Sequence, residues 1–122
     1  MLIDSNIIIY ATKPEHAALR HFITDHGPAV SAVSYVEVLG YHKLAEQERT
    51  LLEAFFAAAL VLPLSQPVLD QAVKLRQLRK MTLGDALIAG TALAYNLILV
   101  TRNTADFSWI AGLSTLNPFE QV

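Results

Sequence analysis

The sequence predicts an α/β three-layer sandwich, in which a central and mostly parallel sheet of about five strands lies between layers of helices. Short apolar runs that suit buried strands alternate with longer segments whose apolar residues recur at helical spacing. Strands joined by helical crossovers pair in parallel and place helices on both faces of the sheet. The chain has 122 residues and is 53% hydrophobic, so we expect residues 1–122 to form a single domain with a substantial core.

The first expected strand is residues 1–3, and residues 5–12 begin a helix that Pro14 limits, because proline removes a backbone donor. Residues 14–26 carry apolar side chains at intervals that fit an amphipathic helix. Gly27 and the proline after it are typical of a helix end.

The second strand is expected at residues 29–33 and the third at residues 60–64, each a short run rich in apolar residues. Between them we expect two helices, residues 34–45 and residues 48–59. Ser34 is the expected N-cap of the first, because its hydroxyl can accept a bond from a free backbone N–H.

A long amphipathic helix is expected over residues 66–80, with Pro67 in its first turn, where its missing N–H costs little. Residues 83–96 form an apolar helix rich in small side chains. Residues 97–101 suit a buried strand, and residues 113–119 can hold a fifth.

Composition excludes several classes of protein. The formal net charge of −2 gives no overall attraction to nucleic acid, so RNA contact needs a local basic patch. Without cysteine there is no disulfide, zinc–thiolate site or cysteine nucleophile. No signal peptide is apparent, and the longest apolar run, residues 54–62, is too short to span a bilayer. We therefore expect a soluble, cytoplasmic protein.

Four carboxylates stand near the ends of expected strands or in the first turns of the helices that follow: Asp4, Glu37, Asp85 and Asp106. Ligands of open α/β sheets bind outside the carboxyl ends of the strands, and at least three of the four acids are placed to reach that edge. Clustered carboxylates repel one another, so they take up protons or bind a cation. Ligands that are all oxygen suit Mg²⁺ or Mn²⁺.

Each carboxylate also has a structural explanation. Ser34-x-x-Glu37 matches a capping box, and Thr82-x-x-Asp85 resembles one. The other two acids can cap the helix or turn that follows them. Caps do not explain why an acid should precede a segment as apolar as residues 86–94, and four such coincidences are less probable than one site.

Four motifs together resemble the PIN-domain ribonucleases of the VapC toxin type, found in type II toxin–antitoxin systems. They are LIDSN at residues 2–6, SYVEVLGY at 34–41, LGDALIAGTALAYNLILVTRNTADF at 83–107 and GLSTLNPF at 112–119. The resemblance covers nearly the whole chain and preserves the order of the motifs. The third motif is the most specific.

This resemblance implies a PIN-like fold and an endoribonuclease that uses Mg²⁺ or Mn²⁺ to hydrolyse RNA, leaving 5′-phosphate and 3′-hydroxyl ends. It also implies a cognate antitoxin that masks the site, and a homodimer. The alternative is a non-catalytic PIN-like module that binds RNA or a protein partner. Loss of an acid would favour that alternative, and none is lost.

By position, the resemblance assigns catalysis to the four acids, with Asp4, Asp85 and Asp106 holding the metal directly or through water. Glu37 is either a ligand or the group that orients and deprotonates the attacking water. Three polar side chains are expected to support these groups or to contact phosphate: Asn6, Thr101 and Asn103. Many relatives carry Pro or Ala where this chain has Gly84, a departure expected to affect helix entry and not ligand chemistry.

Four basic residues are candidates for contact with RNA phosphates or with the antitoxin. Arg76, Arg79 and Lys80 are expected to share one helix face at i, i+3 and i+4, although a solvated face is an equally good explanation. Arg102 has the stronger claim, because it lies between two polar residues of the most specific motif.

Other acidic α/β sites fit the sequence less well. A haloacid-dehalogenase-like phosphatase needs a second Asp two residues after the first, where this chain has Asn6. A receiver domain needs a Lys at the end of a late strand, where Thr101 and Arg102 stand. The phosphate-binding motif GxxxxGK is absent from the sequence.

Overall fold

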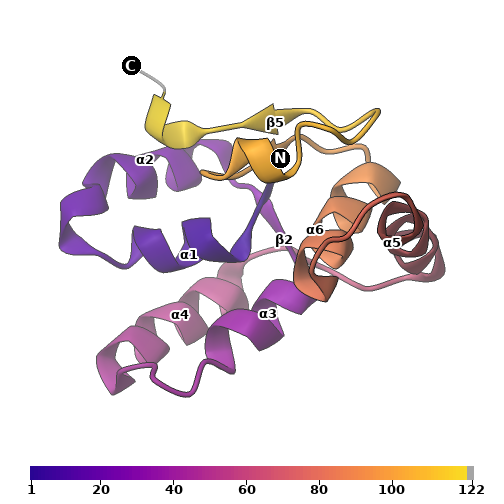
Figure 1. Cartoon of the computed structure of the whole chain (residues 1–122). Helices are drawn as coiled ribbons and strands as arrows, with labels where there is room; N and C mark the ends of the chain where they lie inside the picture. The colour runs from indigo at the N-terminus through magenta and orange to yellow at the C-terminus, as the bar shows by residue number, and fades with distance from the viewer. Residues whose placement is uncertain (121–122) are drawn as a thin grey trace.

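The computed structural model describes residues 1–120 (Figure 1). It contains five strands: β1 (Leu2–Ile3), β2 (Ala29–Ser31), β3 (Val61–Leu62), β4 (Leu99–Val100) and β5 (Thr115–Leu116). The α-helices are α1 (Ser5–Ala11), α2 (Ala17–His26), α3 (Ala32–Leu39), α4 (Glu46–Ala58), α5 (Gln66–Leu78) and α6 (Leu83–Ala94). Short 3-10 turns lie at η1 (Pro14–His16), η2 (Thr104–Asp106) and η3 (Pro118–Glu120).

The five strands form one parallel sheet in the order β3-β2-β1-β4-β5. The central strand β1 pairs on one side with β2 and on the other with β4, so that Leu2 lies opposite both Ala29 and Leu99. The chain builds one half of the sheet outward from β1, then crosses back to start the other half at β4. The carboxyl ends of β1 and β4 therefore form the switch point, where sheets of this kind bind their ligands.

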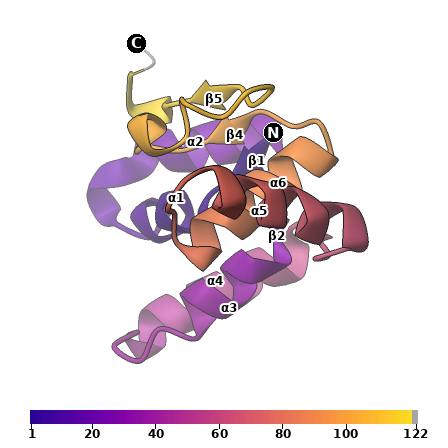
Figure 2. The ribbon, with the colours of Figure 1, turned by 45° about the vertical axis from the view of Figure 1, so that its right-hand side comes forward.

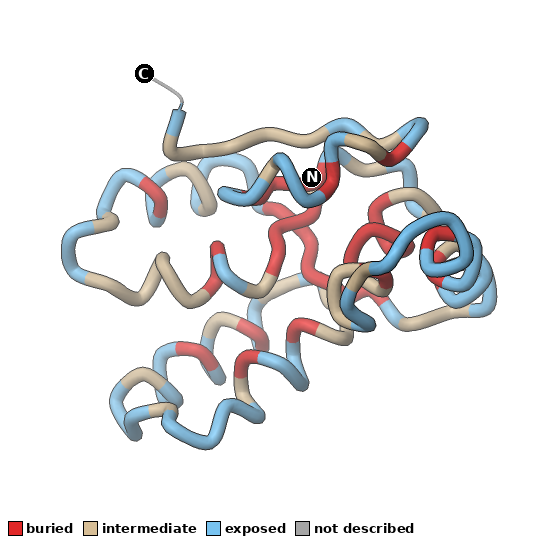
Figure 3. The backbone as a smooth tube through the Cα atoms, viewed as in Figure 1, coloured by how far each residue is buried: buried red, intermediate tan, exposed pale blue. Residues whose placement is uncertain are grey.

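Successive strand residues serve two separate cores, one on each face of the sheet. Leu2 and Leu99 pack with apolar side chains of α5 and α6. Ile3 and Val100 point the other way and pack with side chains of α1, α2, α3 and α4. Figure 3 shows the buried residues concentrated where the strands meet these helices. The expected sandwich, with helices on both faces of a five-stranded sheet, is confirmed.

Helix α6 lies inside the protein, as its apolar sequence predicts: six of its residues are buried. It runs beside α5, which Figures 1 and 2 both show. The two backbones approach closely at Gly90, where a Cβ atom would stand 2.8 Å from the carbonyl oxygen of Val68. Its N-terminus, which carries Asp85, is fixed by this packing.

Helix α3 begins earlier than the sequence predicts. Its N-cap is Ser31, whose hydroxyl accepts a bond from the backbone N–H of Val33 at 3.3 Å, so the prediction of Ser34 as N-cap is wrong. Ser31 is buried and its hydroxyl lies 3.0 Å from that of Thr91 on α6, which ties the start of α3 to the core. The helix ends at Leu39 and does not continue to residue 45.

One smaller correction concerns the start of a helix. The segment 14–26 opens as the 3-10 turn η1 before α2 begins, and α2 ends at Gly27 in the left-handed conformation, as expected of a glycine there.

The fifth strand is present as β5. Among the helices of residues 1–120, none combines the length and the apolar character needed to cross a membrane.

Candidate active site

Asp4 directly follows β1 and starts α1. Its carboxylate oxygen Oδ1 accepts a bond from the backbone N–H of Ile7 at 2.9 Å, so it is the N-cap of the helix. Its own backbone N–H donates to the carbonyl oxygen of Val100 at 3.1 Å, which joins it to the end of β4. The side chain is only 5% exposed, so a charge is held at the switch point with little access to water.

The surroundings of Asp4 raise the pKa of its carboxyl group above the ordinary value. Burial is the main cause, and the negative charges of Asp85 and Glu37 act in the same direction. Hydrogen bonding by the Thr101 hydroxyl and by the backbone of Ile7 opposes the rise. Asp4 is therefore close enough to two other acids for their charges to affect its ionisation.

Asp85 lies in the first turn of α6 and is half-buried. Its backbone N–H donates to the hydroxyl of Thr82 at 3.1 Å, so Thr82 is the N-cap, as the capping motif suggests. Partial burial is the main cause that raises the pKa of the Asp85 carboxyl group. The negative charge of Asp106 raises it further, and that of Glu37 does so more weakly. A side-chain hydrogen bond with Thr82 lowers the pKa. This carboxylate is the one that links Asp106 to the other acids.

Glu37 is exposed on α3, and its carboxylate is held by contacts with two other elements. The Ser5 hydroxyl, on the first residue of α1, lies 2.7 Å from Glu37 Oε1. The other carboxylate oxygen lies against Gly84 of α6, in the space that a Cβ atom would fill. The capping box with Ser34 does not form, because Ser34 is already inside the helix and its hydroxyl lies 2.9 Å from that of Ser5.

The structure thus brings together four carboxylates from four segments that are distant in the sequence. The charges of Asp85 and Glu37 raise the pKa of Asp4, and the charges of Asp106 and Glu37 raise the pKa of Asp85. Of the four, Asp4 directly follows β1 and is bonded to the end of β4, and Asp106 lies in η2, shortly after β4. Their catalytic and metal-binding roles stay predictions.

None of these carboxylates is neutralised by a basic side chain in residues 1–120, where the ion pair that forms joins Lys13 to Glu48 at 3.1 Å. As placed, the acids and histidines of those residues bring no three groups close enough together to hold a metal ion. The chemistry of the set still fits a hard divalent cation, because all the donors are carboxylate oxygens and their repulsion is uncompensated.

The three polar residues expected near the acids differ in position. Thr101 is buried at the end of β4, beside Asp4, and its hydroxyl accepts a bond from the backbone N–H of Asn103 at 3.1 Å. Asn6 and Asn103 are exposed, on α1 and in the loop before η2. Of the three, Thr101 is the one that the structure joins to an acid.

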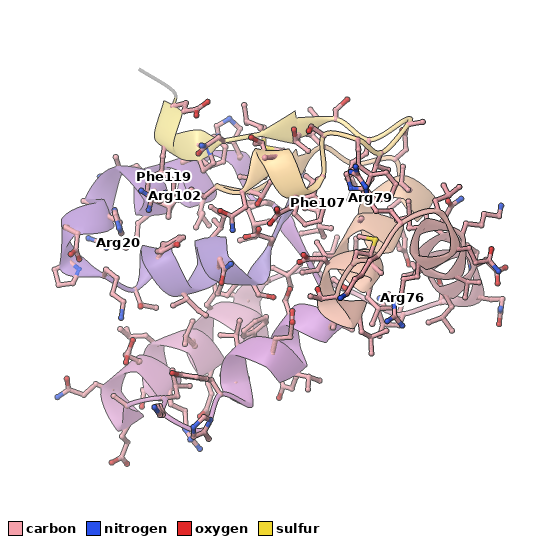
Figure 4. All side chains as sticks on the ribbon, viewed as in Figure 1. Arg20, Arg76, Arg79, Arg102, Phe107 and Phe119 are labelled. Atoms are coloured by element: carbon pink, nitrogen blue, oxygen red, sulfur yellow. The ribbon has the colours of Figure 1, made fainter. Side chains whose placement is uncertain are left out.

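The expected basic face of α5 does not form. The helix ends at Leu78, and Arg79 takes an extended conformation, with φ −158° and ψ 149°, so Arg79 and Lys80 do not share a helix face with Arg76. The short connection to α6 forces the chain out of the helix before these residues. The Arg79 guanidinium instead lies over the ring of Trp109 at 4.9 Å, and Figure 4 shows it well apart from Arg76.

Arg102, directly after β4, lies over two aromatic rings. Its guanidinium carbon is 4.5 Å from the ring centre of Phe119 and 5.3 Å from that of Tyr10. Figure 4 shows Arg102 and Phe119 together near α1 and α2. Tyr10 belongs to α1 and Phe119 to the C-terminal turn η3. Contact with both rings restrains the Arg102 side chain, which remains exposed to solvent.

A cavity of about 490 Å³ lies elsewhere, between α1, α2 and α4. Its lining includes Ile8, Ile23, Leu52 and Phe55, and none of the four acids. The four acids therefore lie outside this apolar cavity: Glu37 and Asp106 are exposed, Asp85 is half-buried and Asp4 is buried.

Three residues have contacts around Glu37 that were not expected from the sequence: Ser5, Ser34 and Gly84. Ser5 is part of the LIDSN motif, and Ser34 precedes Glu37 by one helical turn. That spacing is the signal that could have placed Ser34 and Glu37 on one face of α3. The contact of Glu37 with Gly84 has no local signal, because the two residues are far apart in the sequence.

The family model of the PIN domain matches residues 1–113 of the sequence. The chain belongs to the PIN-domain family. Within that family it is similar to the tRNA(fMet)-specific endonuclease VapC of Shigella flexneri, at 32% identity over 124 residues that include 93% of this chain and 94% of that protein.

Solved structures agree with this assignment. A toxin–antitoxin complex from Klebsiella pneumoniae contains a chain with 29% identity and a TM-score of 0.77, with 98% of each chain covered. A DNA-bound VapBC from Salmonella typhimurium has a TM-score of 0.84 at 21% identity, with 96% of each chain covered, which shows the likeness of the fold.

Proposed function

We propose that this protein is a metal-dependent endoribonuclease of the VapC type, which hydrolyses phosphodiester bonds of RNA. The observation that supports the proposal is that four carboxylates from four segments affect one another's ionisation in overlapping pairs, and that one of them, Asp4, follows the central strand at the switch point of the sheet. The Shigella flexneri relative, which is named as an endonuclease, supports it.

The proposed cofactor is Mg²⁺ or Mn²⁺, held by Asp4, Asp85 and Asp106 directly or through water. When bound, such an ion lowers the pKa of water and stabilises the charge that develops on a phosphate under attack. Asp4 is the most restrained of the three ligands, because its backbone and one carboxylate oxygen are already bonded.

The chain's own residues supply the remaining steps. Glu37 accepts a proton from the water that attacks phosphorus, and the bond from phosphorus to the 3′ oxygen breaks. The leaving oxygen takes a proton from solvent, which gives a 3′-hydroxyl and a 5′-phosphate. Thr101 orients Asp4 through its hydroxyl. Ser5 fixes the Glu37 carboxylate that receives the proton.

We propose that the substrate is initiator transfer RNA, because the Shigella flexneri relative, at 32% sequence identity, is named as specific for tRNA(fMet). An open site suits a large substrate better than an enclosed cavity does. Arg102 is the basic residue best placed to contact a phosphate, since its cation is exposed and held by two rings beside the site. We propose a cytoplasmic location for the activity, in keeping with this substrate.

We also propose a cognate antitoxin as partner and a homodimer as the assembled toxin. The support for the antitoxin is the similarity to a chain of a toxin–antitoxin complex at 29% identity. Co-purification of the protein with the product of an adjacent gene would test the partner, and light scattering of the free toxin would test the dimer.

The decisive experiment compares two substrates under three conditions. Purified protein, free of antitoxin, is incubated with initiator tRNA or with elongator methionine tRNA, in Mg²⁺, in Mn²⁺ and in excess EDTA. We expect cleavage of the initiator tRNA that needs metal and is lost in Asp85→Asn. Folded protein that cuts neither RNA would contradict the proposal and favour a binding module, whereas equal cutting of both would contradict only the substrate.

A further inference from the structure

We infer that Ser5, Ser34 and Gly84 are positioning residues that together hold the Glu37 carboxylate against the first turn of α6, beside Asp85. The consequence for cleavage rests on the proposed function. The positioning itself is a property of the metal-free chain and is tested separately.

The two serines form a short chain of hydrogen bonds that ends on Glu37. The hydroxyl oxygens of Ser34 and Ser5 are 2.9 Å apart, and that of Ser5 is 2.7 Å from Glu37 Oε1. The single proton of the Ser5 hydroxyl can be donated to Ser34 Oγ or to Glu37 Oε1, and the carboxylate is the nearer and the charged acceptor of the two. Ser34 is fully buried, which fixes the far end of this chain.

Gly84 bounds the other side of the space that the Glu37 carboxylate occupies. A Cβ atom built on it would overlap Glu37 Oε2 and lie 3.2 Å from the carboxyl carbon. The carboxylate is the end of a flexible side chain, so a larger residue at 84 displaces it without disturbing the backbone. The absence of a Cβ at Gly84 therefore leaves the room that the Glu37 carboxylate occupies, and the inference extends the effect of this position from helix entry to the site.

A carboxylate in this place needs such contacts. Glu37 is exposed, and a long side chain loses rotamer freedom when it is fixed. Its charge also lies near those of Asp4 and Asp85, which repel it. The hydroxyl bond and the space at Gly84 favour the one rotamer that keeps the carboxylate at the site.

The first test uses metal-free protein and does not depend on activity. The carboxyl carbon of Glu37 is observed by NMR in glutamate-labelled protein and assigned by its loss in Glu37→Gln. We expect its resonance to move in Ser5→Ala and in Gly84→Ala, and to stay in place in the control Ser114→Ala, which changes an exposed serine. A resonance unchanged in both test variants, with the fold retained, would overturn the inference.

The second test measures cleavage. We expect Ser5→Ala and Gly84→Ala each to lower kcat by about tenfold to a hundredfold, the usual cost of losing a group that orients a catalytic residue, with little change in KM. Neither change should lower the residual activity of Glu37→Gln further, because both act through that carboxylate. Additive losses in the Glu37→Gln background would overturn the inference. Wild-type protein that cuts no RNA contradicts the proposed function, and the NMR result still decides the positioning.

Discussion

Replacing Asp4 separates its two roles, because one carboxylate oxygen caps α1 while the group as a whole adds charge to the site. Asparagine keeps an oxygen for the backbone N–H of Ile7 and removes the charge, whereas alanine removes both. Loss of an N-cap costs about 1 kcal/mol, so we expect Asp4→Ala to be less stable than Asp4→Asn by about that amount. For a domain of this size the difference is roughly 4 °C in Tm.

The raised pKa of Asp4 gives a second expectation, with a definite sign. Its folded-state pKa lies above the unfolded value, so the folded state binds the proton more tightly. Ionisation therefore destabilises the protein as the pH rises from the unfolded value, 3.8, through the folded one. Asp4→Asn has no such ionisation, so its Tm relative to wild type should rise as the pH increases from 3.8 through the raised pKa of Asp4.

Thermal unfolding by circular dichroism, repeated across that pH range, measures both effects, and RNA cleavage is measured in parallel. We expect both variants to be inactive and Asp4→Ala to be the less stable of the two. The reasoning is refuted if Asp4→Asn is the less stable of the two, or if it cuts RNA as well as wild type does.

Three further predictions concern metal, glycine and arginine. Mg²⁺ or Mn²⁺ at about 100 times its Kd should stabilise wild type by about 2.7 kcal/mol, and Asp85→Asn should lose this gain in calorimetry; an equal gain in both would contradict the metal site. Gly84→Ala should leave the Tm unchanged or raise it, because alanine stabilises a helix by up to about 1 kcal/mol relative to glycine, while cleavage falls. A lowered Tm would show that the backbone cannot accept the Cβ atom. Arg102→Gln should weaken RNA binding and reduce its logarithmic salt dependence by about one unit, whereas an unchanged slope would exclude a phosphate contact.

Much of the fold was predictable because the strands are short, apolar and separated by helical periodicity. The alternation of Leu2 with Ile3, and of Leu99 with Val100, places one residue of each pair in each core. The position of Asp4 followed from the same pattern, since a residue at the end of a parallel strand must lie at the ligand-binding edge.

Features that depend on distant contacts were not predictable in the same way. Ser31 and Ser34 are equally good caps by sequence, and Ser31 is the cap because it ends β2 and contacts Thr91 of α6. The expected basic face does not form because α5 ends at Leu78, which leaves a short connection before α6. A periodic pattern of apolar residues does not show where a helix must end.

Asp4 shows why helix capping and site formation should not be treated as alternatives at such positions. The end of a parallel strand is also the start of the next helix, so a carboxylate there meets free backbone N–H groups and the ligand-binding edge at once. In Asp4 the cap uses Oδ1, and that bond holds the carboxylate where the charges of Asp85 and Glu37 act on it. The cap is therefore the means by which the acid is positioned. It follows that a side chain which caps as well but carries no charge should preserve the helix and remove the activity.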